Sequence, residues 1–191
     1  MRVPKIYCAG RIAHGDWRTG LYDNNTPSFR DWESEAYERQ VETFPVTQMI
    51  GHEALYTGPY FVACDHGCYH GEASHGVGAD EGGGCAGGPG TDLRRKATVR
   101  ACGTAIRNSD MMYVYLEDLE AYGTLVEIGM AVAADIPVYI NIKTGVNIDR
   151  AMWFALTAAE RVGYGNTPAS SLSESITHFN RWGRTRGRNQ W

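Results

Sequence analysis

The sequence lacks several features that would assign it to a well-marked class of proteins. It has no uninterrupted apolar run of the roughly 18 residues that a membrane-spanning helix needs, so we expect no membrane partner. Its start, Met1 to Arg11, has no apolar stretch long enough for the core of a signal peptide. It contains no G-x-S-x-G sequence, no P-loop and no complete dinucleotide-binding fingerprint, so none of those active-site types is indicated.

The net charge is small and the number of cysteines is low. The 191 residues carry a formal net charge of −4, which gives no general reason to expect a nucleic acid polymer as a partner. The five cysteines are an odd number in a chain without an export signal, which favours reduced thiols and a cytoplasmic location. A locally basic run near the end of the chain reads as a solvated or subunit-contacting tail; it consists of Arg181, Arg184, Arg186 and Arg188.

What is present is an alternation of short apolar runs with helical patterns. The runs 5–9, 111–116 and 137–142 predict buried strands, and 54–64 predicts a strand interrupted by Gly58-Pro59. Helices are expected over 29–43, 92–107, 124–134 and 149–162. This order predicts an α/β fold with one doubly wound domain, an about five-stranded, mainly parallel sheet and helices on both faces. The loops after residues 9, 64, 116 and 142 should then share one rim of the sheet.

Two boundaries follow from this pattern. Residues 1–165 are expected to form the α/β domain, and residues 166–191 a C-terminal helix and basic tail packed on the same domain or extending from it. Inside the first part, residues 65–90 form an insert rich in glycine and histidine that fits no helix or strand, so we expect a long loop.

The Gly/His-rich insert leaves three interpretations open. It could be a substrate lid or base pocket, in which Asp65, His66 and Tyr69 reach the ligand and a histidine donates a proton to the leaving base. It could be a surface or subunit-interface loop. It could also hold a metal, although its one-residue spacings differ from the usual zinc pairs, and we predict none; the ligand types are Cys64, His66, Cys68, His70, His75 and Cys85.

The most informative segment runs from Asp110 to Gly129. A buried strand leads into an acidic loop, and Gly123 then turns the chain into a helix whose first turn is expected to carry Glu127. A carboxylate there would be favoured by the helix dipole by about 0.3–1 kcal/mol, which lowers its pKa modestly. Thr124-x-x-Glu127 also fits a capping box, in which Glu127 would only bond back to the start of its helix.

This segment resembles the signature of the nucleoside 2-deoxyribosyltransferase superfamily, which includes nucleoside 5′-monophosphate N-glycosidases. The residues that match its turn and the aspartate opening its strand are Asp110, Gly123, Thr124, Glu127, Ile128 and Gly129. The first strand with its glycine turn, Ile6 to Gly10, and the later strand, Pro137 to Ile140, resemble that superfamily in order and spacing over roughly residues 4–165.

The resemblance implies an enzyme that cleaves the N-glycosidic bond of a nucleoside or nucleotide without a cofactor. Glu127 would be the nucleophile and would form a glycosyl ester, as in retaining glycosidases. Asp118, in preference to Glu120, would orient it or contact the base or sugar; a solvated acidic loop is the alternative. The resemblance also implies a homo-oligomer, a dimer or higher. Asp110 is expected to cap its strand instead of taking part in chemistry.

The loop after the first strand supplies further candidates. Arg11 and Arg18 could bind a 5′-phosphate or be plain surface arginines. Trp17 could stack on a base or fold back on the core. With Gly10, Gly123 and Thr124 they complete the predicted substrate-binding residues.

Two other functions stay open at this point. A TIR-type NAD glycohydrolase also combines a small parallel sheet with a catalytic glutamate, and it would release nicotinamide. A nucleotide-binding sensor that kept the fold without turnover would bind tightly and give no product. The presence of Glu127 favours an enzyme over a sensor.

Overall fold

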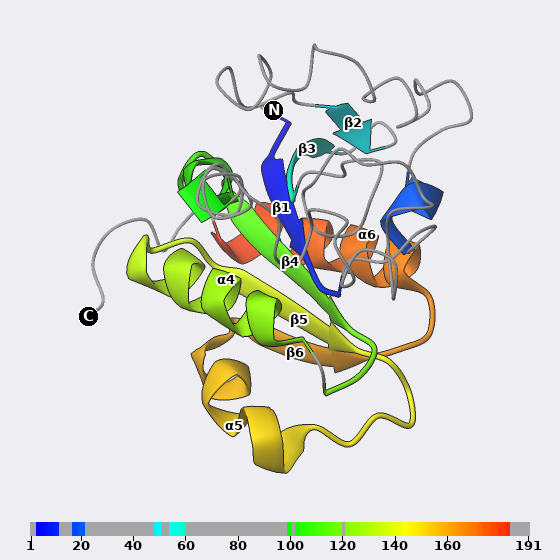
Figure 1. The fold of residues 1–191 in the computed structure, drawn as a ribbon. Coiled ribbons are helices and arrows are strands. Elements are labelled where there is room, and N and C mark those ends of the chain that lie inside the picture. The colour runs from blue at the N-terminus through cyan, green and yellow to red at the C-terminus, as the bar shows by residue number, and fades with distance from the viewer. Residues whose placement is uncertain are drawn as a thin grey trace, which may run out of the picture.

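The computed structural model describes residues 3–11, 17–21, 48–50, 54–59, 99–100, 102–119 and 121–183. Its centre is a six-stranded sheet in the order β2-β3-β1-β4-β5-β6 (Figure 1). Five neighbouring strands are parallel, and β2 pairs antiparallel with β3 at one edge. The predicted α/β fold with a mainly parallel sheet is confirmed. The strands are β1 (Lys5–Ala9), β2 (Gln48–Ile50), β3 (Ala54–Gly58), β4 (Met111–Leu116), β5 (Val138–Ile142) and β6 (Arg161–Tyr164).

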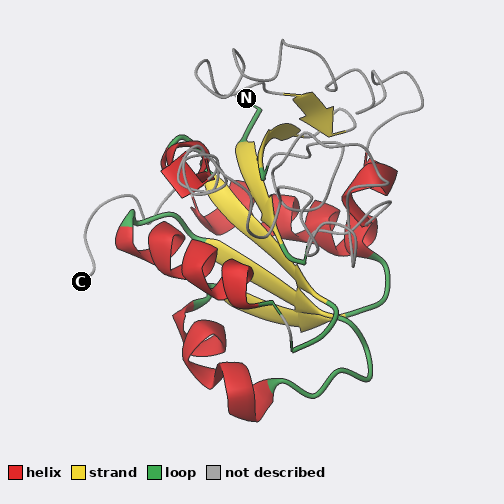
Figure 2. Ribbon diagram, viewed as in Figure 1, coloured by secondary structure: helices red, strands yellow, loops and turns green. Residues whose placement is uncertain are grey.

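Helices cover both faces of the sheet, as expected for a doubly wound fold (Figure 2). On one face lie α4 (Tyr122–Ala133), α5 (Asp149–Ala158) and the helical residues 99, 100 and 102–107. On the other lie the 3-10 helix η1 (Trp17–Leu21) and α6 (Pro168–His178), which continues into the π-helical turn η4 (Phe179–Gly183).

The central strand β4 shows why this sequence forms a sheet buried on both sides. All six of its residues are buried, and their side chains alternate between the two helical layers. Met112, Val114 and Leu116 join the core beneath α4 and α5, whereas Met111, Tyr113 and Tyr115 join the core beneath α6. Burial of each large apolar side chain contributes about 1.5–3 kcal/mol, so this strand anchors both layers.

The core beneath α6 is rich in tyrosine, and each ring there has a partner for its hydroxyl group. Tyr113 bonds with Ser171 of α6, Tyr115 donates to the Gly165 carbonyl at 3.3 Å, and the Tyr139 hydroxyl lies 3.3 Å from His178 Nδ1. Leu172 and Ile176 of α6 fill the space between these rings. The helix expected after residue 165 is therefore packed on β4 and β5.

The predicted helix over 149–162 is wrong in its last part. Helix α5 ends at Ala158, and β6 follows as a parallel edge strand beside β5. The Glu160 amide donates to Val138 at 2.8 Å and the Gly165 amide to Ile142 at 2.9 Å, so pairing with β5 replaces the helical bonds. The helical periodicity predicts a buried face made of Ala151, Phe154, Ala155, Ala158 and Val162. In the structure Met152 and Ala155 are buried and Phe154 is exposed, so that face is only partly right.

Several other predicted elements cannot be compared. The charged helix over 29–43 and the Gly/His-rich insert at 65–90 lie outside the described residues, as does the start of the helix over 92–107. The strand predicted over 54–64 is present as β3 and ends at Gly58. The peptide bond from Gly58 to Pro59 is cis, and Pro59 is the last described residue of this segment.

Candidate functional site

The strand order creates a switch point between β1 and β4. The chain leaves β1 to form β3 on one side and later returns to form β4 on the other. Ligands in open α/β sheets bind beyond the carboxyl ends of the strands at such a point. Gly10, which follows β1, has a φ of +149°, and a Cβ there would lie 2.6 Å from the Tyr115 carbonyl oxygen. Only glycine lets the two chains pass so closely at this point.

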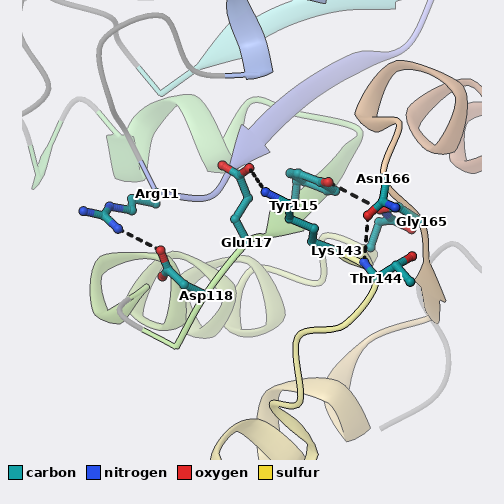
Figure 3. Close-up of polar contacts among 9 residues, drawn as sticks. Arg11, Tyr115, Glu117, Asp118, Lys143, Thr144, Gly165 and Asn166 are labelled. Atoms are coloured by element: carbon teal, nitrogen blue, oxygen red, sulfur yellow. Dashed lines mark hydrogen bonds and ion pairs between the residues drawn. The ribbon is translucent and has the colours of Figure 1, made fainter.

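An ion pair spans the switch point from one loop to the other. Arg11, which follows β1, places Nη1 2.8 Å from Oδ2 of Asp118, which follows β4 (Figure 3). About half of the Arg11 side chain and a third of the Asp118 side chain are exposed. Both residues were predicted site residues, and the fold brings them together at the rim.

The rim continues across the ends of β5 and β6. Lys143 pairs with Glu117 at 3.5 Å, and the Thr144 amide donates to the Asn166 side chain at 3.1 Å (Figure 3). Beneath them the Tyr115 hydroxyl donates to the Gly165 carbonyl. These bonds link the loops after β4, β5 and β6 to one another, so they hold the three loops together at this edge of the sheet.

Glu127 does not cap its helix. Helix α4 begins at Tyr122 after Ala121, two residues earlier than predicted, and no side chain caps it. Glu127 therefore lies in the second turn, beyond reach of the first amide, and Thr124 is buried in the first turn. The half-buried carboxylate instead accepts a hydrogen bond at Oε1 from the Tyr7 hydroxyl of β1. The capping-box alternative and the first-turn placement are both wrong.

The pKa of Glu127 is raised above its ordinary value, not lowered as the helix-dipole argument predicted. Burial is the largest cause, because an ionised carboxylate loses hydration beneath the helix. The hydrogen bond from Tyr7 and the charge of Arg18 act in the opposite direction and offset only part of this effect. Because Glu127 lies in the second turn, little of the helix dipole acts on it.

Tyr7 is a site residue that the sequence analysis missed. Its side chain is fully buried, and a Cβ on Gly58 would lie 2.8 Å from its ring, so the missing side chain at Gly58 makes room for it. Burial, then the charge of Glu127, raises the pKa of Tyr7, which keeps its hydroxyl protonated as a donor. The available signal was a tyrosine within an aliphatic strand, since a buried tyrosine hydroxyl needs a partner.

Arg18 has a different role from the predicted one. It is fully buried, and its guanidinium donates to the carbonyl oxygens of Cys8 at 2.7 Å, Gly10 at 2.7 Å and Arg11 at 3.0 Å. These bonds bind η1 to the carboxyl end of β1. Its burial and these bonds argue against binding of a phosphate by Arg18. Its positive charge instead lowers the pKa of Glu127.

Trp17 folds back on the core, which was one of its two predicted placements. Its ring meets Tyr113 and Tyr115 edge to face, each at 5.6 Å between centroids, and the Arg18 guanidinium lies 4.6 Å from its centroid. Among the described residues its buried Nε1 has no hydrogen-bond partner. The packing argues against base stacking through this ring.

The remaining predicted residues fall into two groups. Asp110 directly precedes β4, but its carboxylate accepts from the Lys5 amide at 2.8 Å, so it caps the start of the neighbouring strand β1 and not its own strand. Gly123 lies exposed in the first turn of α4. The others lie outside the described residues; they are Asp65, His66, Tyr69 and Glu120, with the possible metal ligands of the insert between Cys64 and Cys85.

The described residues indicate neither a metal site nor a membrane-spanning helix. Within the described ranges, no three histidine, cysteine or acidic side chains gather closely enough to hold a metal ion. No helix in that part of the chain is long and apolar enough to cross a membrane. No protein-family model and no curated protein sequence matches this chain.

Proposed function

We propose that this protein breaks the N-glycosidic bond of a nucleoside or nucleoside 5′-monophosphate, with Glu127 as the nucleophile. The observation that carries this proposal is the direction of the Glu127 side chain. It leaves its own helix and is held by Tyr7 of β1, one of the two strands at the switch point. A carboxylate with only a capping role would not be placed this way.

The chemistry requires one oxygen of the carboxylate for attack. Tyr7 binds Oε1, and within the described part of the chain Oε2 makes no hydrogen bond. In the proposed first step Oε2 forms a bond to C1′ of the sugar while the bond from C1′ to the base nitrogen breaks. The base leaves with that electron pair and takes a proton from water or an acid side chain. Water or a second base then attacks C1′ and releases Glu127.

Tyr7 and Arg18 supply the electrostatic support for both steps. Burial raises the pKa of Glu127 and so disfavours its ionised form, whereas the Tyr7 hydrogen bond and the Arg18 charge favour that form. In the second step the carboxylate is the leaving group, so the same donor stabilises the negative charge that returns to it. The neighbours thus make a half-buried carboxylate usable as a nucleophile and as a leaving group.

Arg11 and Asp118 are the proposed contacts for the rest of the substrate. The exposed guanidinium of Arg11 suits a 5′-phosphate, which would replace Asp118 as its partner. Asp118 would then accept from a sugar hydroxyl or the base. No step needs a metal or cofactor. A cytoplasmic location fits Cys8 and Cys102, the two cysteines among the described residues, neither of which is in a disulfide.

The test is base release from deoxyribonucleosides, ribonucleosides, their 5′-monophosphates and NAD, measured by chromatography for wild type and Glu127→Gln. Glutamine keeps an acceptor for Tyr7 but is not a nucleophile, so we expect kcat to fall at least about a thousandfold with the fold intact. The matched control is Glu174→Gln on exposed α6, which should leave kcat unchanged.

The other outcomes separate the alternatives. Release of nicotinamide from NAD alone would indicate a TIR-type glycohydrolase. Tight nucleotide binding without product would indicate a sensor. Undiminished base release by Glu127→Gln would remove Glu127 from the chemistry.

A further inference from the structure

We propose that Cys102 is a third member of the Glu127 site, a positioning residue that acts through Tyr7. Its thiol donates a hydrogen bond to the Tyr7 oxygen, and the Tyr7 hydroxyl in turn donates to Glu127. The expected effect of Cys102 on catalysis rests on the proposed function. Its effect on the Glu127 carboxylate can be measured without any turnover, so the two can be tested apart.

The helical residues 102–107 bring Cys102 beside Tyr7. A Cβ on Gly58 would lie 2.8 Å from the Tyr7 ring and 3.4 Å from the Cβ of Ala105, so this helix and the Tyr7 ring meet at the same point of β3. Ala105 lies one turn from Cys102 on the helix. Cys102 is partly buried and packs against the core cluster that contains Tyr7 and Ala105.

The same helix also approaches α4 close to Glu127. A Cβ on Gly103, the residue after Cys102, would lie 3.8 Å from the sulfur of Met130. Met130 follows Glu127 by about one turn of α4. The first turn of the helix that carries Cys102 therefore lies between β1 and α4, the two elements that the contact between Tyr7 and Glu127 joins.

The single proton of the Tyr7 hydroxyl fixes the direction of the two hydrogen bonds. Tyr7 donates this proton to Oε1 of Glu127, so its oxygen can only accept from the Cys102 thiol. In a chain of hydrogen bonds each bond polarises the next and strengthens it, by about 10–30%. Cys102 should therefore strengthen the bond that orients Glu127 and favours its ionised form.

The charged and titratable groups around the carboxylate come from several elements. Burial raises the pKa of Glu127, whereas Tyr7 of β1 and Arg18 of η1 lower it. Cys102 acts on Tyr7, whose pKa is raised first by burial and next by the charge of Glu127. The influence of Cys102 on Glu127 therefore passes through the Tyr7 hydroxyl, and it should disappear when that hydroxyl is removed.

The experiment measures the pKa of Glu127 by NMR of its side-chain carboxyl carbon, together with the pH dependence of base release. Cys102→Ala removes the donor to Tyr7, so we expect the pKa of Glu127 to rise and the acid limb of kcat to move to higher pH. On that limb kcat should fall about two- to threefold at a fixed pH, with little change on the plateau. Cys102→Ser keeps a donor and should restore the wild-type behaviour.

Two controls separate this role from a loss of packing. Cys8→Ala removes the other thiol of the described residues, which lies in the opposite core, and should leave the pKa of Glu127 unchanged. In a Tyr7→Phe background Cys102→Ala should cause no further change, because the link to Glu127 is already broken. Cys102→Val keeps most of the volume without a donor and replaces Cys102→Ala if alanine does not fold.

The outcomes decide the proposal whether or not the enzyme is active. A rise in the pKa of Glu127 that serine reverses supports the role of Cys102, even if no variant and no wild type releases base; the proposed function alone would then be wrong. An unchanged pKa in Cys102→Ala overturns the role. So does a rise that serine does not reverse, or one of equal size in the Tyr7→Phe background.

Discussion

At the scale of single residues, the pair formed by Tyr7 and Glu127 links the first strand to helix α4. Tyr7 is fixed by burial and by the missing side chain at Gly58, so it holds Glu127 in one direction. Its hydrogen bond also favours the charged form of the carboxylate against the effect of burial. Tyr7 is thus a positioning residue for Glu127, with an effect on ionisation as well as orientation.

This role gives a prediction about pH. If Glu127 must be ionised to attack, the acid limb of kcat reports its pKa. Tyr7→Phe removes a group that lowers this pKa, so the pKa rises and the acid limb moves to higher pH. A pH series of base release would measure the shift. Tyr139→Phe, which removes another buried hydroxyl from the opposite core, should leave the acid limb in place. Equal profiles for wild type and Tyr7→Phe would contradict this role.

At this scale the sequence singled out Glu127 as a candidate, but it predicted neither the position of Glu127 within its helix nor its surroundings. The turn from Gly123 to Gly129 singled out Glu127 by resemblance. Asp110 was predicted to cap its own strand, but its carboxylate bonds to the first amide of β1. Arg18 was misjudged because an arginine near a strand end resembles an anion ligand. Its burial among three carbonyl oxygens depends on how η1 folds back over β1, which no local pattern encodes.

At the scale of elements, the carboxyl ends of β1 and β4 are held close together at Gly10. A Cβ at this position would meet the Tyr115 carbonyl at 2.6 Å, and its φ of +149° disfavours any other residue. We expect Gly10→Ala to lower the free energy of unfolding by about 1–3 kcal/mol, measured by urea denaturation.

Gly123→Ala is the control for that substitution. Nothing lies within 4 Å of a Cβ on Gly123, and alanine favours the first turn of α4. We expect no loss of stability there, with a gain of up to about 1 kcal/mol. Equal losses for the two variants would show that the close approach at Gly10 is not what limits stability.

The elements that were predicted and those that were missed differ in burial. The runs that became β1, β4 and β5 are buried along almost their whole length, so each left a continuous apolar pattern. The edge strand β6 has a short mixed sequence with exposed ends, Arg161 and Tyr164. Its first two residues fell within the helix predicted over 149–162, and no strand was predicted there. Its pairing with β5 is a long-range effect that periodicity does not report.

At the scale of the whole molecule, the contact between Glu127 and Tyr7 joins helix α4 to β1, two elements that lie far apart in the sequence. It does so next to the switch point between β1 and β4, so the fold as a whole determines where the Glu127 carboxylate lies.

The central claim is that an oxygen of Glu127 forms a bond to C1′ of the sugar, and mass spectrometry of the intact protein tests it most directly. The protein is acid-quenched during turnover of a nucleoside with fluorine on C2′, which destabilises the positively charged transition state and slows release of the ester. We predict a mass increase equal to the glycosyl group, mapped after digestion to the peptide with Glu127 and absent from Glu127→Gln. Base release with the adduct on another residue, or an adduct that persists in Glu127→Gln, would contradict the claim.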